Sequence, residues 1–367
     1  MILIKKLDRT YNDAMLSILA SSPMETHLME LFFDKSPDMF MLSDLWSDKH
    51  TYYGIFVDEI LAGFGMHLIY KGFVGGQINE IAYIGNFCID KKFRGRGLFY
   101  QLAEHILKEY DQKGEFGFCI ILQGNKSAER YFDERKPLLA TMPVYQKIGS
   151  YETRSILITK KKRIINKYQI RKAEKTDIKS ILNLLHLEYD KKMLAQEINI
   201  KIFNENISRR DGFNIENYLL AFDGQDLVGV CATWDMKSIR RTRILKYKRR
   251  ILVIKMLYKI IASILGYPSL PKPGGALKEV YITHIAVIDK NPEILEALLR
   301  SIYNEFKMKK YNLIHFASFK NDPLLVAAKP FFTTPLYSNI YFSSKNDQLI
   351  QDSTNNIDKP YIDITLI

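Results

Sequence analysis

The sequence has little of what marks secreted, membrane-spanning or metal-binding proteins. It contains only three cysteines, Cys88, Cys119 and Cys231, and each stands in an apolar, strand-like run. Buried free thiols explain this usage better than a disulfide or a metal site. The first residues contain no secretory apolar region, and no uncharged apolar run approaches the roughly 20 residues that cross a bilayer. We therefore expect a cytoplasmic protein that needs no metal.

Acidic residues are missing from one long segment of a basic chain. The net charge is +12, and residues 236–278 hold twelve lysines and arginines but no aspartate or glutamate. Outside this segment the basic residues equal the 41 acidic residues in number, so the whole excess of charge is local. A charge excess confined to one segment indicates a local anionic partner rather than a property of the whole protein.

The same order of sequence blocks occurs twice. The block "IKKLDRTYNDAMLSIL" from Ile4 is echoed by "IRKAEKTDIKSILNLL" from Ile170, at an offset of 166 residues. The block "YIGNFCIDKK" from Tyr83 is echoed by "YITHIAVIDK" from Tyr281, at an offset of 198 residues. The larger offset places 32 extra residues in the second copy, inside the basic segment. The repeat therefore predicts two domains of one fold, the second with an insert.

Each copy predicts the same order of secondary structure. A strand and an amphipathic helix are followed by two strands around a turn, a central strand, a second helix and a further strand. A strand–helix–strand passage implies a parallel pair, so we expect an α/β (α+β) fold with a mixed, mostly antiparallel sheet and flanking helices. The expected divisions are a first domain at 1–160, a basic linker at 161–167, a second domain at 168–345 with the insert at about 236–278, and a polar tail with a possible terminal strand at 346–367.

A glycine-arginine loop lies between the central strand and the second helix of the first copy. In "CIDKKFRGRGLFYQLAEHIL", Arg94 to Gly97 follow the strand, and Leu98, Leu102 and Ile106 begin a helical apolar pattern. Unpaired amides at a helix N-terminus attract anions, glycines allow close backbone approach, and arginines donate to phosphate oxygens. The loop therefore predicts a site for a phosphorylated ligand. It matches neither a dinucleotide-binding nor a P-loop fingerprint.

At these residues the chain resembles the GNAT acyltransferase superfamily. The family motif, Arg/Gln-x-x-Gly-x-Gly/Ala, corresponds to Arg94, Gly97 and Phe99, and "QGNKSAERYF" from Gln123 resembles the family's asparagine-led helix. The resemblance follows the element order of both copies. It implies a tandem GNAT-like protein that binds acetyl-CoA or another acyl-CoA as substrate and transfers the acyl group, as an N-acetyltransferase does, to an amine.

The resemblance also implies which residues meet the cofactor. The pantetheine arm would pair with the backbone of Phe87, Cys88 and Ile89, where the sheet opens between its fourth and fifth strands. The pyrophosphate would face the amides of the loop and first helical turn, and Asn125 would begin the helix beside the thioester. The expected pyrophosphate residues are Arg94, Gly95, Arg96, Gly97, Leu98 and Phe99.

The catalytic groups are less well defined by the pattern. The family's acid is a tyrosine seven residues after the asparagine, but Phe132 stands there and Tyr131 is one place early. Tyr131 is thus a candidate acid and also a candidate core residue. Glu80 and Asn86, in the fourth strand, are candidate bases or structural residues. The Met- and aromatic-rich stretch from Pro23 to Leu42 fits an apolar acceptor site and core packing equally well.

The second copy lacks the cradle. Asn291, Pro292 and Glu293 replace the glycines, and proline offers no N–H while glutamate repels phosphate. His284 aligns with Asn86, and it either faces the cleft or has a structural role. We expect a degenerate partner domain. Two functional alternatives remain open: a non-catalytic acyl-CoA sensor or scaffold recruited to an anionic membrane, and an acyltransferase acting on RNA or an acidic protein.

The insert, from Lys237 to Gly266, has a helical apolar pattern that ends before Gly266. The apolar seam consists of Ile244, Tyr247, Ile251, Ile254, Tyr258, Ile261 and Leu265. Basic residues crowd its first half and aliphatic residues its second, a combination typical of a helix that lies in an anionic membrane surface. Packing on the protein's own body explains the seam as well, whereas nucleic acid fits less, because the second half is too apolar for a phosphate track. The enzyme would then be peripheral at the membrane.

Overall fold

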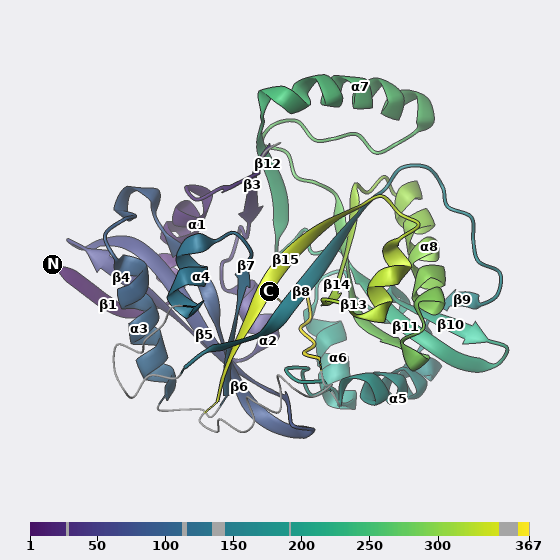
Figure 1. Cartoon of the computed structure of the whole chain (residues 1–367), viewed down its shortest axis with the longest axis horizontal. Coiled ribbons are helices and arrows are strands. Elements are labelled where there is room, and N and C mark those ends of the chain that lie inside the picture. The colour runs from purple at the N-terminus through teal and green to yellow at the C-terminus, as the bar shows by residue number, and fades with distance from the viewer. Residues whose placement is uncertain (27–28, 112–115, 134–143, 191, 345–358, 367) are drawn as a thin grey trace.

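The protein was analysed as a computed structural model of the whole chain. The description covers residues 1–26, 29–111, 116–133, 144–190, 192–344 and 359–366. Among them, twelve strands form one continuous sheet in the order β1-β4-β5-β6-β7-β15-β8-β14-β13-β11-β10-β9 (Figure 1). The prediction of a mixed, mostly antiparallel sheet with flanking helices is confirmed.

The two ends of the sheet belong to the two halves of the chain, and each half contributes five strands in the same spatial order. The first half supplies β1 (Ile2–Leu7), β4 (Lys49–Val57), β5 (Ile60–Val74), β6 (Gln77–Ile89) and β7 (Phe116–Leu122). The second half supplies β9 (Gln169–Lys172), β10 (Tyr218–Asp223), β11 (Asp226–Trp234), β13 (Glu279–Val287) and β14 (Leu313–Phe319). The turns at Asp58 and at Gly224 lie between paired strands, as the sequence predicts.

The middle of the sheet is formed by an exchange of strands. β8 (Gln146–Leu157), the last strand of the first half, pairs with β14 of the second half. β15 (Thr333–Ser344), from the second half, pairs with β7 of the first half and with β8. The two halves therefore share backbone hydrogen bonds across the centre of the molecule, and the expected boundary near residue 160 follows a strand already embedded in the second half.

Each half opens its sheet beside a bulge. The parallel ladder between β6 and β7 ends at Tyr83 paired with Phe118, and that between β13 and β14 ends at Tyr281 paired with His315. Just beyond, Asn86 and His284 have positive φ values of 54° and 51°, and the pairing with the preceding strand shifts register. A bulge bends its strand away from the neighbour. The same irregularity thus occurs at corresponding positions of both halves.

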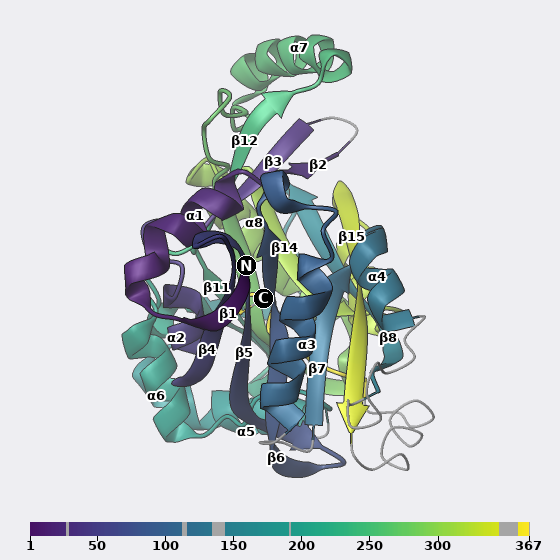
Figure 2. The same ribbon diagram turned by 90° about the vertical axis from the view of Figure 1, so that its left-hand side faces the viewer.

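Helices cover both faces of the sheet (Figures 1 and 2). Leu98, Leu102 and Ile106 of α3 are buried with Phe132 of α4 in one core cluster, which confirms the apolar pattern after the loop. Tyr110, the next residue of that pattern, lies in α3, but its side chain is outside the described residues. The helices are α1 (Asn12–Ala20), α2 (Met41–Trp46), α3 (Leu98–Asp111), α4 (Lys126–Asp133), α5 (Ile178–Tyr189), α6 (Ile200–Arg209) and α8 (Pro292–Met308). Short 3₁₀ helices span Arg9–Tyr11, Lys91–Phe93, Lys175–Asp177, Ile215–Asn217, Ile288–Lys290 and Pro323–Ala328.

The basic insert forms a strand and a helix that stand away from the main sheet (Figure 1). The prediction of one helical seam from Ile244 onward is wrong for its first part, because Arg241–Tyr247 forms β12, which pairs with β3 (Met29–Asp34). Thr242 and Ile244 alternate with more exposed residues, as a half-buried strand requires. β2 (Met24–Glu25) completes this second sheet.

The second part of the insert is helical as predicted. α7 (Arg249–Leu265) ends at Gly266, whose φ of 64° gives the left-handed helix end that glycine favours. None of the helices in the described part of the chain has the length and apolarity needed to cross a membrane.

The end of the described chain is buried between the two halves. No strand is assigned in residues 359–366, and residues 345–358 of the expected polar tail lie outside the described part. Ile362 accepts a hydrogen bond from the Tyr151 hydroxyl at 2.6 Å, and Asp363 accepts one from Thr283 Oγ1 at 2.7 Å. The segment therefore links β8 to β13.

Candidate functional site

The opening between β6 and β7 forms a groove lined by described residues. Its cavity volume is about 760 Å³. One wall is the end of β6, including Asn86, Phe87 and Ile89, and another is β7 with Asn125 beyond it. Arg94, Gly95, Gly97, Leu98 and Phe99 line the rim. The structure thus brings most of the residues predicted to bind the cofactor to one groove.

The glycine-arginine loop leaves the backbone at this rim open. Gly95 and Gly97 have φ values of 79° and 71°, in the left-handed region that other residues rarely adopt. A Cβ placed on either glycine would meet no atom within 4 Å, so the space beside the backbone is free for a ligand. The side chain of Asp90 accepts from Lys92 N and fixes the turn that leads into the loop. The loop geometry suits close approach of an anion to the N-terminus of α3.

The two arginines of the loop are held differently. Arg94 donates from Nε to the carbonyl of Ile89 at 3.0 Å and from Nη2 to Ser22 Oγ at 2.6 Å. It thereby joins the end of β6 to the end of α1. The Arg96 guanidinium lies over the Phe93 ring, 5.3 Å from its centroid. Arg94 lines the groove and adds positive charge next to the open backbone, whereas the Arg96 side chain is not part of the groove lining.

Phe99, which stands where the family has a small residue, lies inside an aromatic cluster. Its ring meets those of Phe87 and Tyr131 edge to face at centroid distances of 5.3 and 5.5 Å. Phe132 is among the groove-lining residues and Tyr131, which is buried, is not. Tyr131 therefore lies one layer behind the groove, and its role as the acid stays a prediction.

Asn125 occupies the start of α4, as the resemblance implies. Its Oδ1 accepts from Ala128 N at 3.5 Å, and its carbonyl accepts from Glu129 N at 2.9 Å. The residue also lines the groove. The asparagine therefore begins the helix and borders the groove at once.

Asn86 is one of the polar residues that line the groove, and it contacts a buried lysine. Lys35 Nζ donates to Asn86 Oδ1 at 3.0 Å, and Asn86 Nδ2 donates to the Tyr52 hydroxyl at 3.3 Å. Lys35 is 9% exposed, and burial, together with the positive charge of Arg240, lowers its pKa to about 8. Burial also raises the pKa of Tyr52 to about 12, so this hydroxyl remains protonated. The network puts a titratable amine next to the bulge.

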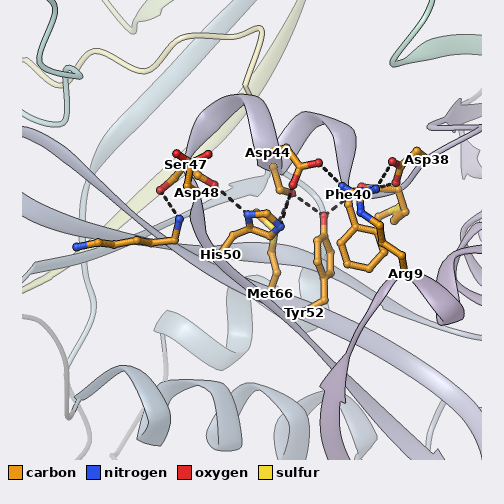
Figure 3. Close-up of polar contacts among 12 residues, drawn as sticks. Arg9, Asp38, Phe40, Asp44, Ser47, Asp48, His50, Tyr52 and Met66 are labelled. Atoms are coloured by element: carbon orange, nitrogen blue, oxygen red, sulfur yellow. Dashed lines mark hydrogen bonds and ion pairs between the residues drawn. The ribbon is translucent and has the colours of Figure 1, made fainter. Parts of the chain in front are cut away.

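An ion-pair chain braces the helix beside this network (Figure 3). Arg9 pairs with both Asp38 and Asp44, and its guanidinium lies over the Phe40 ring. The same Asp44 carboxylate also reaches His50, with Oδ1 3.3 Å from His50 Nε2. The Tyr52 hydroxyl shares a 2.8 Å hydrogen bond with Ser43 on the same helix. These contacts fix α2 over β4 and so hold Tyr52 where it meets Asn86.

Glu80 and Cys88 lie outside the lining of this groove. Glu80 forms an ion pair with Lys49 and borders a different hollow, next to Gln196 and Glu197 of the second half. The Cys88 thiol lies on the α1 side of β6, 3.9 Å from the Ile18 carbonyl, and burial raises its pKa. A thiol with a raised pKa is a poor nucleophile. The Cys88 backbone remains part of the strand end that borders the groove.

The second half has the opening but no open loop. Asn291 Oδ1 accepts from Glu293 N at 2.9 Å and caps α8, and Glu293 forms an ion pair with Lys167 at 2.9 Å. His284 is buried, its Nδ1 lies 2.9 Å from the Tyr218 hydroxyl, and burial lowers its pKa to about 4. The helix N-terminus is thus occupied by the protein's own side chains. Among the described residues, no group of three or more His, Cys, Asp or Glu side chains is arranged to hold a metal ion.

Lys35 lies outside the groove lining but contacts Asn86, and the sequence pattern did not identify it. It stands in the stretch from Pro23 to Leu42 that fits an acceptor site or core packing. The only signal was a lysine in a mostly apolar, aromatic stretch, and its contact with Asn86 spans 51 residues of sequence. A contact over such a distance depends on strand pairing, which local pattern does not define.

Comparison with known proteins agrees with this geometry. Residues 13–135 match the family model described as the Acetyltransferase (GNAT) family. No curated protein matches the chain by sequence.

Several solved structures share the fold. Saccharomyces cerevisiae N-myristoyltransferase with bound myristoyl-CoA is 12% identical, with a TM-score of 0.58 over 93% of this chain and 82% of that one. A GCN5-related N-acetyltransferase from Anabaena variabilis is also 12% identical, with a TM-score of 0.52 over 96% of this chain and 75% of that one. A probable N-acyltransferase from Enterococcus faecalis is 11% identical, with a TM-score of 0.51 over 96% and 74%. At 11–12% identity, the structural similarity establishes the fold alone.

Proposed function

We propose that the first half of the chain transfers the acyl group of acetyl-CoA to an amine, since residues 13–135 match the model of the GNAT acetyltransferase family. The observation that carries the proposal is the groove between β6 and β7, bordered by the open Gly95–Gly97 backbone. The pyrophosphate would lie at this rim, and the thioester would reach the inner end near Asn86. Acetyl-CoA is the proposed donor because the matching family model is that of acetyltransferases.

The transfer forms one bond and breaks one. The amine nitrogen attacks the thioester carbonyl, the carbon–sulfur bond breaks, and CoA leaves as a thiolate. The amine must lose a proton, and the thiolate must gain one. Asn86 has no titratable group, so we assign it the positioning of the amine; Glu80 is engaged with Lys49 outside the groove.

Lys35 is the proposed proton acceptor. It contacts Asn86 directly, and a pKa of about 8 makes a substantial fraction neutral under weakly alkaline conditions. Tyr131 is kept as the candidate acid for the thiolate. Its ring contacts those of Phe99 and Tyr100, which both line the groove. A water molecule is the alternative acid.

Two rival functions have separate tests. A non-catalytic sensor would bind acyl-CoA without consuming it, and an enzyme acting on RNA or an acidic protein would ignore small amines. Mass spectrometry of the full chain with acetyl-CoA, a longer acyl-CoA and a panel of amines distinguishes these cases. Formation of an acylated amine together with free CoA supports the proposal, and saturable binding without any turnover contradicts it.

A further inference from the structure

α7 has two faces with different surroundings. Ile251, Lys255, Tyr258 and Ala262 recur at helical spacing on its inner face, and Ile251 and Ala262 are buried. The Tyr258 hydroxyl donates to the Pro268 carbonyl at 2.8 Å, and Lys255 Nζ lies 3.6 Å from the Tyr247 ring centroid. These described side chains of the inner face pack α7 on β12 and on the segment that follows the helix.

The outer face of α7 is apolar, and no part of the chain that the structure describes covers it. Six large apolar side chains on it are between 47% and 76% exposed: Met256, Leu257, Ile260, Ile261, Ile264 and Leu265. They recur every three to four residues over the last three turns, so they form one continuous stripe. Isolated exposed apolar residues are ordinary, but a contiguous stripe on a projecting helix marks an interaction surface.

The charges on this arm are arranged for an external anion. Arg249 occupies the first turn of α7, where the helix dipole disfavours a cation; that turn has no acidic residue, and the last turn has no basic one. Lys246, Arg249 and Lys259 are exposed, and no ion pair is found for any of them among the described residues. Residues 236–278 contain no acidic side chain, and although Lys248 pairs with Glu25 of β2, the arm carries an excess of positive charge.

We propose that α7 docks the enzyme on an anionic lipid membrane, with its apolar stripe in the interfacial layer and its cations at the headgroups. An apolar stripe next to unpaired cations is the combination that such a surface binds, and it does not require a spanning helix. A second copy of the chain fits less well, because two identical positive arms repel each other. The proposal does not depend on the identity of the donor or the acceptor.

Docking through α7 would orient the acceptor side of the enzyme toward the membrane. β12, which leads into α7, pairs with β3, and Arg241 and Arg243 bind Asp34 at 3.0 and 2.6 Å. Lys35 follows Asp34 directly and contacts Asn86 in the groove. The arm is thus tied to the strand that carries the proposed proton acceptor, which favours an amine presented at the membrane surface.

The test is co-sedimentation of the full chain with vesicles of phosphatidylcholine containing rising shares of phosphatidylglycerol. Binding should rise with phosphatidylglycerol and fall with salt. Arg249→Glu with Lys259→Glu should weaken it by at least about 25-fold, since each cation near such a surface contributes roughly fivefold. Ile260→Asp with Ile264→Asp should weaken it on the order of 10-fold or more. Met308→Asp, which changes an 80% exposed residue at the end of α8, is the matched control and should bind as the wild type does.

Two further measurements keep the test decisive. Acetyl-CoA affinity, measured by calorimetry, should be the same in all variants, which verifies folding and is independent of docking. A wild type that ignores phosphatidylglycerol vesicles at low salt would overturn the proposal. A control variant that loses binding as strongly as the arm variants would also overturn it. So would light scattering that shows a dimer for the wild type but not for the variant with Ile260→Asp and Ile264→Asp.

Discussion

The amine of Lys35 lies 3.0 Å from the side-chain oxygen of Asn86, at the bulge where the central strand opens the sheet. One partner comes from the stretch before α2 and the other from β6, so the contact joins that stretch to the groove proposed to bind acyl-CoA. A lysine this buried is unusual unless paired with an anion. Its lowered pKa, about 8, gives the contact a measurable signature.

The first prediction concerns the stability of the fold at different pH values. Below pH 8, Lys35 is protonated in both folded and unfolded chains, so the cost of burying the cation is fully present. Between about pH 8 and its ordinary pKa of 10.5, the folded state loses the proton and this cost disappears. Lys35→Met should therefore raise the free energy of unfolding near pH 7 by up to about 3 kcal/mol, with a gain that shrinks toward alkaline pH. Denaturant titrations across this range measure the difference.

The same variant separates stability from catalysis. If Lys35 accepts the proton, Lys35→Met should lower kcat on the order of 100-fold while acetyl-CoA affinity is kept. Lys179→Met, at an exposed position on α5, is the matched control and should change neither property. An unchanged kcat in Lys35→Met would remove Lys35 from the mechanism.

A second prediction tests the arginine at the rim. Arg94→Ala should weaken acetyl-CoA binding by about 1.5–3 kcal/mol, the scale of a hydrogen bond to a charged group. Because Arg94 also joins Ile89 to Ser22, the variant should lose some stability as well. Arg94→Lys keeps the charge but not both hydrogen bonds. Its acetyl-CoA affinity should therefore lie between those of the wild type and Arg94→Ala. Calorimetry should find one site per chain; two sites, or no effect of Arg94→Ala, would contradict the assignment of the cradle to the first half.

A third prediction uses two glycines with the same backbone. Gly97 and Gly212 have φ values of 71° and 67°, and a Cβ on either would meet no atom within 4 Å. Valine should therefore destabilise the fold similarly at both positions, through backbone strain alone. Only Gly97→Val should nearly abolish acetyl-CoA binding, because it fills the space that the pyrophosphate needs. Equal affinities in the two variants would show that the loop does not hold the ligand.

The last prediction concerns the candidate acid. Tyr131→Phe keeps the ring packed against Phe99 and removes only the hydroxyl. If that hydroxyl protonates the thiolate, kcat should fall on the order of 100-fold with little change in affinity for acetyl-CoA. A kcat equal to that of the wild type would make Tyr131 a core residue and water the acid. The pH profile of kcat, measured on the wild type and the variant, distinguishes two causes. Loss of the acid changes the shape of the profile, whereas a disturbed groove lowers kcat at every pH.

The sequence by itself predicted the features that depend on local pattern. Residue spacing predicted α3, and the glycines of the loop predicted an open backbone before it, since helical periodicity and left-handed φ values are properties of neighbouring residues. Asn291 and Pro292 predicted the missing cradle in the second half. The absence of acidic residues in 236–278 predicted a positive arm, because charge requires no folding to be counted.

Tertiary structure decided everything that depends on which strand lies beside which. β8 of the first half pairs with β14 of the second, and β15 of the second half pairs with β7 of the first. The first part of the predicted helical seam, around Ile244, forms a strand because it pairs with the edge of β3. The meeting of Lys35 with Asn86, and the choice of the face of α7 that stays uncovered, follow from the same cause. Contacts between distant segments are selected by the packing of the whole chain, and local periodicity does not encode them.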